Sequence, residues 1–99
     1  YLCGQVPFHP VTGEVVGNGM KEQAVQTLAN MKAVLEAAGL AVTDIAKTTV
    51  FVTNMDDFAA FNEVYAAFMG EHRPARVCVE VSNIAHGCLL EMDAICFKE

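Results

Sequence analysis

The strongest constraint on the fold is the spacing of apolar residues in two stretches of the chain. The first set recurs with the roughly 3.6-residue period of a helix and ends just before Gly39, a residue typical of helix ends: Ala24, Leu28, Met31, Leu35 and Ala38. The second set has the same period and lies between Asn54, a favourable N-cap, and Gly70: Phe58, Phe61, Tyr65 and Phe68. The spacing predicts two helices, with the aromatic side chains in the core rather than around a cofactor.

Segments with the character of β-strands surround these two helices. They are rich in β-branched residues or alternate between apolar and polar positions: residues 1–6, 48–53, 75–81 and 88–97. After a turn at residues 9–13, residues 14–16 are expected to pair back on the first strand. The predicted order is two strands, helix, strand, helix and two strands, which defines an α+β fold with a mixed sheet.

Two helices can cover only one face of such a sheet, so its other face needs a cover. The chain has 99 residues, of which 54% are hydrophobic, and residues 1–99 fit one domain. A domain of this size buries only about 60–65% of the surface of its unfolded chain. We therefore expect part of the apolar surface to meet another subunit.

Charge, hydropathy and cysteine spacing argue against nucleic-acid binding, membrane insertion and metal binding, respectively. The formal net charge is −6 and no basic patch is visible, so nucleic acid is not expected as a partner. No apolar stretch is long enough to span a membrane and no signal-peptide pattern opens the sequence, which favours a cytoplasmic location. An organellar location stays open if a targeting segment precedes the sequence. Four cysteines without C-x-x-C spacing indicate reduced thiols, mostly buried, and no metal site.

Three side chains are candidates for chemistry, each with a structural alternative. Arg76 could anchor a substrate carboxylate through its planar fork, although the pattern alone favours a structural ion pair with one of three carboxylates: Glu80, Glu91 or Asp93. Glu91 follows two leucines and could serve as a general acid or base, or it could simply face water. Cys78 is a poor candidate nucleophile because no histidine is placed beside it by spacing.

Seven stretches, in order along nearly the whole chain, carry a resemblance to a known family: GQVP at 4–7, TGE at 12–14, QTLANMKAVLEAAG at 26–39, KTTVFV at 47–52, MDDFAAFN at 55–62, PARVCVEV at 74–81 and EMDAI at 91–95. The segment at 74–81 is the most specific of them. On these motifs the sequence resembles the Rid (YjgF-like) family of reactive-intermediate deaminases.

The resemblance implies a chorismate-mutase-like α+β fold and a homotrimer that packs through its sheets, with helices outside and sites between subunits. It also implies a hydrolase like 2-iminobutanoate/2-iminopropanoate deaminase, which converts enamines and imines such as 2-aminoacrylate to 2-keto acids and ammonia. No cofactor is implied. The partners expected are a small carboxylate substrate and further copies of the chain, and neither nucleic acid nor a membrane.

The family's site residues carry over to six positions. Arg76 matches the arginine that binds the substrate carboxylate, and Glu91 matches the glutamate that positions the attacking water. Four further positions match substrate-binding or lining residues: Cys78, Asn62, Cys3 and Gly4.

Three features depart from the family. Cys3 stands where the family usually has serine, and the loop at 82–87 lacks a basic residue that His86 could replace in part. The family's first N-terminal strand, with its site tyrosine, has no counterpart, so residues 1–99 are expected to lack that strand. Two alternatives therefore stay open: a trimeric module that binds small carboxylates without turnover, and a relative that cleaves RNA or inhibits translation.

Overall fold

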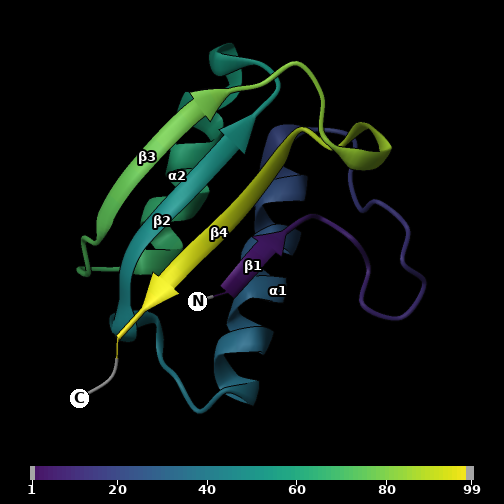
Figure 1. Cartoon of the computed structure of the whole chain (residues 1–99). Helices are drawn as coiled ribbons and strands as arrows, with labels where there is room; N and C mark the ends of the chain where they lie inside the picture. Colours follow the sequence, from purple (N-terminus) through teal and green to yellow (C-terminus); the bar gives the residue numbers. More distant parts are fainter. Residues whose placement is uncertain (1, 98–99) are drawn as a thin grey trace.

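The computed structural model describes residues 2–97, without the side chain of Cys3. Its main elements are β1 (Leu2–Gln5), α1 (Met20–Ala37), β2 (Ile45–Val52), α2 (Phe58–Met69), β3 (Ala75–Glu80) and β4 (Leu90–Cys96). Three short 3-10 turns connect them: η1 (Val42–Asp44), η2 (Met55–Asp57) and η3 (Ala85–Gly87). The strands form one sheet in the order β1-β4-β2-β3, in which only β2 and β3 are parallel (Figure 1).

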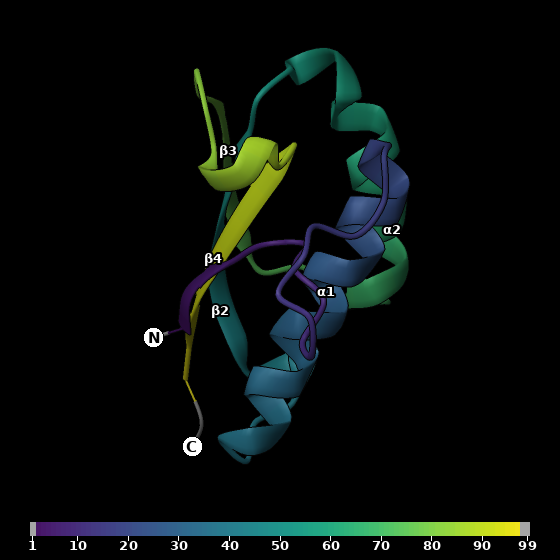
Figure 2. The same cartoon turned by 90° about the vertical axis from the view of Figure 1, so that its right-hand side faces the viewer.

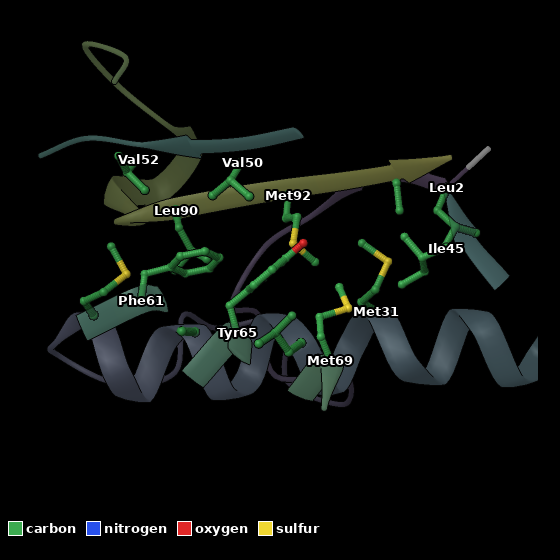
Figure 3. Close-up of a cluster of buried hydrophobic side chains, with 14 of the residues drawn as sticks. Leu2, Met31, Ile45, Val50, Val52, Phe61, Tyr65, Met69, Leu90 and Met92 are labelled. Carbon is green, nitrogen blue, oxygen red and sulfur yellow. The ribbon is translucent and has the colours of Figure 1, made fainter. Parts of the chain in front are cut away.

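Both helices cover the same face of this sheet (Figure 2). The core lies between the two layers, where Phe61 and Tyr65 of α2 point toward Val50, Leu90 and Met92 of the sheet (Figure 3). The expected α+β fold, with a mixed sheet and two helices on one face, is confirmed.

The helix ends follow from local chemistry. At the end of α1, Gly39 has a φ of 74° and donates its N–H to the Glu36 carbonyl at 3.1 Å, while Leu40 donates to Leu35 at 2.8 Å. This paired bonding ends the helix, as the position of Gly39 predicted. Asn54 caps η2 rather than α2 itself, because its Oδ1 accepts from the N–H of Asp56 at 3.0 Å.

Residues 14–16 pair back as predicted, but they do not form a strand of the sheet. An isolated antiparallel bridge joins Phe8 and Val15, Val16 donates its N–H to the Pro7 carbonyl at 2.8 Å, and His9 donates to the Glu14 carbonyl at 2.7 Å. The sheet has four strands among residues 2–97. The physical reason is a competing anchor on α1. The Asn30 amide donates to the carbonyls of Val6 and Phe8, at 2.8 Å each, so the chain leaves the sheet after β1 and crosses α1 (Figure 2).

Among residues 2–97, no helix covers the other face of the sheet (Figure 2). Its outward side chains include Val77, Val79 and Ile95, which are 45%, 38% and 44% exposed. Apolar side chains gathered on an open sheet face are typical of a surface that another protein covers.

Candidate functional site

Arg76 lies on β3, at the edge of the sheet, and its side chain is directed to the helix layer. In the parallel register of β2 and β3, Arg76 is paired with Thr48, whose side chain is buried under the helices. The Nη1 group of Arg76 donates to Oδ1 of Asn62 on α2 at 2.6 Å. This hydrogen bond joins two residues that the sequence predicted as parts of one site.

Two aromatic rings of α2 also hold the Arg76 guanidinium. Its Cζ atom lies 4.7 Å from the ring centre of Tyr65 and 5.1 Å from that of Phe58, which are cation–π contacts. The Tyr65 hydroxyl in turn shares a buried hydrogen bond of 2.9 Å with Thr48 Oγ1. The Arg76 guanidinium is therefore fixed in direction before any ligand arrives.

The alternative interpretation of Arg76, a structural ion pair, is wrong. Glu91 and Asp93 are paired with Phe51 and Thr49, whose side chains point to the opposite face of the sheet from Arg76. The Glu80 carboxylate accepts instead from the N–H of Met55 at 2.7 Å. A guanidinium without a carboxylate partner keeps its charge available for an anion.

Arg76 opens into a cleft of about 450 Å³ between α2 and the start of β3. Its lining residues are Asn62, Tyr65, Ala66, Met69, Arg73, Pro74 and Arg76. The lining holds two cations and no carboxylate, and the volume is within the range of small-molecule sites. The cleft therefore has the charge and size for a small anionic ligand.

Cys78 lies two residues beyond Arg76 on the same face of β3, paired with Val50, and is half-buried. Burial raises the pKa of the Cys78 thiol, although the nearby positive charge of Arg76 acts in the opposite direction. The thiol therefore stays protonated at neutral pH, which agrees with the prediction that Cys78 is not a nucleophile.

Glu91 lies on the opposite face of the sheet. It is paired with Phe51, an odd-numbered position of β2 whose side chain points away from the helices, whereas Thr48 points toward them. Glu91 and Phe51 line a second hollow of about 240 Å³, together with Val81, Asn83, Ile84 and Ala85.

Gly4 lies directly beside the Glu91 carboxylate. A Cβ atom at position 4 would lie 2.6 Å from Oε2 of Glu91, so only glycine leaves room for this carboxylate. The side chain of Cys3, another predicted site residue, lies outside the described part of the structure.

Within one chain, the predicted site residues thus form two groups on opposite faces of the sheet. Arg76, Asn62 and Cys78 are on the helix side, and Gly4 and Glu91 are on the open side. The contact of Phe58 and Tyr65 with Arg76 was not predicted from the sequence, where the aromatic period indicated core positions alone. The spacing could have indicated that both rings lie beside Asn62, because Phe58, Asn62 and Tyr65 are at i, i+4 and i+7 on one helix face.

Residues 2–97 offer neither a candidate metal centre nor a helix suited to span a membrane. No group of three or more His, Cys, Asp or Glu side chains that could hold a metal ion is found among these residues. Neither of their two α-helices combines the length and the apolar character that are needed to cross a membrane.

The fold and the cleft define a class of protein: a small α+β domain with one open sheet face and, at the sheet edge, a cleft lined by two arginines. Comparison with known families makes the assignment specific. The model of the endoribonuclease L-PSP family matches residues 1–98, so the chain belongs to this family, which is the YjgF/RidA family that the motifs indicated.

Individual relatives agree with this assignment. A RutC family protein of Pyrococcus horikoshii is 50% identical over all of this chain and 79% of its own length. The 2-iminobutanoate/2-iminopropanoate deaminase of Escherichia coli is 49% identical over 96% of this chain and 76% of its own. The crystal structure of E. coli TdcF with bound serine has a TM-score of 0.92 and 44% identity, covering 98% of this chain and 78% of that one.

Proposed function

We propose that this protein hydrolyses small 2-imino acids and their enamine tautomers, such as 2-iminobutanoate and 2-aminoacrylate, to 2-oxo acids and ammonia. The observation that carries the proposal is the Arg76 guanidinium, fixed by Asn62 and two rings in a cleft without a carboxylate. A planar fork of this kind matches a carboxylate with two parallel hydrogen bonds. The name of the E. coli deaminase, a 49% identical relative, supports the same reaction.

The reaction requires one water molecule and no cofactor. The water oxygen bonds to the imine carbon while the C=N electron pair moves to nitrogen, which takes a proton and leaves a carbinolamine. The C–N bond then breaks as the C=O bond forms, and the hydroxyl proton leaves with ammonia. Arg76 holds the substrate carboxylate, and the Glu91 carboxylate accepts a hydrogen bond from the water and directs its oxygen at the imine carbon.

Arg76 and Glu91 can act on one substrate only if they come from different copies of the chain, because in one copy they lie on opposite sheet faces. We therefore place the site between subunits of a homotrimer. The exposed valines of β3 and Ile95 of β4 support packing through the open sheet faces. In this arrangement Asn62 orients Arg76 and Cys78 lines the site. Gly4 and Cys3 line the part of the site that contains Glu91.

The test is the rate at which an imine disappears. 2-Iminobutanoate is generated in place from 2-aminobutanoate by an amino-acid oxidase, and the remaining imine is trapped with semicarbazide. The protein should accelerate ammonia release, Arg76→Ala should abolish the acceleration without changing the mass of the native assembly, and Lys32→Gln should match the wild type as a charge-loss control. Near-normal activity of Arg76→Ala, or no acceleration by the wild type, would overturn the proposal.

A second candidate is a module that binds small carboxylates without turnover. The serine bound in the similar TdcF protein favours it, since serine carries a carboxylate and no imine. Binding of 2-oxobutanoate that depends on Arg76, without any acceleration of imine hydrolysis, would identify this function. The expectation that RNA is not a partner remains a prediction, which a binding titration at low salt tests.

A further inference from the structure

We propose that Arg73 and Arg76 together select imino acids that carry a second carboxylate at the end of the side chain. In this arrangement Arg76 binds the carboxylate next to the imine carbon, and Arg73 binds the distal one. The inference rests on the proposed function, since it names the substrate class of the same cleft.

The first support is where the chain places its arginines. The sequence has two arginines and a net charge of −6, and both arginines line the one cleft of about 450 Å³. Within one chain, no acidic side chain lines this cleft, and the proposed assembly adds one carboxylate, Glu91 of another copy, against the two guanidinium groups. Two guanidinium groups facing one hollow attract a ligand with two negative charges more strongly than a ligand with one.

The second support is the state of the Arg73 side chain. Its Nη1 atom donates to the carbonyls of Gly70 and His72, the latter at 3.0 Å, and the side chain is exposed. These two bonds hold the guanidinium at the loop between α2 and β3. Its Nε and Nη2 groups donate to no residue of the described chain, so they remain available to a carboxylate.

The third support is the span between the two arginines. They are three residues apart with Pro74 between them, so their Cα atoms are separated by at most roughly 10–11 Å. Two long side chains across this span can hold the ends of one short dicarboxylic acid. Ala66 and Met69, which also line the cleft, provide an uncharged wall for the methylene groups between the two carboxylates.

A purely structural role is the competing explanation for Arg73, because arginine side chains often bond the last carbonyls of a helix. The two explanations differ in one measurable quantity. A structural role predicts that loss of Arg73 alters the affinity of mono- and dicarboxylates alike. The proposed role predicts that it alters their ratio.

The experiment uses the native assembly and two stable product analogues, 2-oxopentanedioate and 2-oxopentanoate, with binding measured by calorimetry at low salt. The wild type should bind the dicarboxylate about threefold to tenfold more tightly, between the effect of an exposed ion pair and that of a hydrogen bond to a charged group. In Arg73→Gln the ratio should fall to about one, and Arg73→Lys should keep part of it. Lys32→Gln, a charge loss on α1 away from the cleft, should keep the full ratio.

The outcomes separate this inference from the proposed function. A wild-type ratio near one, or an unchanged ratio in Arg73→Gln, overturns the role of Arg73 even if 2-iminobutanoate is hydrolysed. Failure of imine hydrolysis, with the ratio present and lost in Arg73→Gln, overturns the deaminase proposal but supports a dicarboxylate site. The same comparison can be made kinetically. The ratio of kcat/KM for 2-iminopentanedioate to kcat/KM for 2-iminobutanoate should fall in Arg73→Gln by the same factor as the ratio of binding affinities.

Discussion

Arg76 and Glu91 lie on opposite faces of the same sheet. Arg76 is paired with the inward-facing Thr48 and Glu91 with the outward-facing Phe51, so alternation along β2 separates their side chains. Each side chain lines its own hollow. A reaction that needs both side chains therefore needs two copies of the chain.

The ring of Tyr65 gives a prediction that separates stability from substrate binding. Tyr65→Phe removes the hydroxyl that pairs with buried Thr48 and should lower the free energy of unfolding by about 1–3 kcal/mol. Tyr65→Leu also removes the ring under Arg76 and should raise KM about threefold to tenfold further, because the guanidinium loses its cation–π support. Urea unfolding and steady-state kinetics measure the two effects. Equal KM values in the two variants would show that the ring does not position Arg76.

The close approach of Gly4 to Glu91 predicts a specific loss of activity. In Gly4→Ala the new methyl group would meet Glu91 Oε2 at 2.6 Å, so the carboxylate must move. We expect kcat/KM for imine hydrolysis to fall by roughly one to two orders of magnitude, because the attacking water is displaced with it. Gly19→Ala is the matched control, since no atom lies within 4 Å of its added Cβ and its φ is −124°. Similar activities in both variants would remove Glu91 from the mechanism.

The buried thiols predict how stability depends on pH. Burial raises the pKa of the Cys88 thiol, and the negative charge of Glu91 raises it further. The unfolded chain therefore releases this proton at lower pH than the folded chain. The free energy of unfolding should be steady below the ordinary thiol pKa of about 8.5 and should fall as pH rises through the folded value.

Urea midpoints at pH 7.5 and at higher pH measure this fall. Lysine and tyrosine side chains also titrate in that range, so the control is the same series for Cys88→Ala. This variant should be less stable at every pH, because Cys88 is only 1% exposed, but its stability should fall less steeply with pH. Parallel pH curves for the two proteins would contradict the assignment.

The sequence predicted the helices and most strands because their periodicity is local. The apolar period before Gly39 needs no knowledge of the rest of the chain, and the same holds for the strand character of residues 48–53. Residues 14–16 do not join the sheet as a strand, and the reason is nonlocal. Asn30, on α1, binds the carbonyls of Val6 and Phe8 and draws this segment away from the sheet.

The site was harder to predict because alternation shows which residues share a face but not where that face points. In β3, the more apolar side, with Val77 and Val79, points away from the helices. The side with Arg76 and Cys78 faces them. The Arg76 side chain can lie under the helices because its guanidinium donates a hydrogen bond to Asn62 on α2. This contact depends on how α2 packs on the sheet, which the sequence pattern does not show.

We expect imine hydrolysis to join Arg76 of one copy with Glu91 of another, and mixing of two inactive variants shows whether these residues meet. Arg76→Ala and Glu91→Gln are each expected to be inactive alone. The two variants are unfolded together, refolded in equal amounts, and checked by native mass measurement for assemblies that contain both.

The refolded mixture should recover about a quarter of the wild-type rate of ammonia release, because about three quarters of the trimers contain both variants and about one site in three is complete in each of these. In a cyclic assembly each working site needs Arg76 from a Glu91→Gln copy and Glu91 from the neighbouring Arg76→Ala copy. If mixed assemblies form and remain as inactive as either variant alone, Arg76 and Glu91 do not meet between copies, and the proposed intersubunit site is wrong.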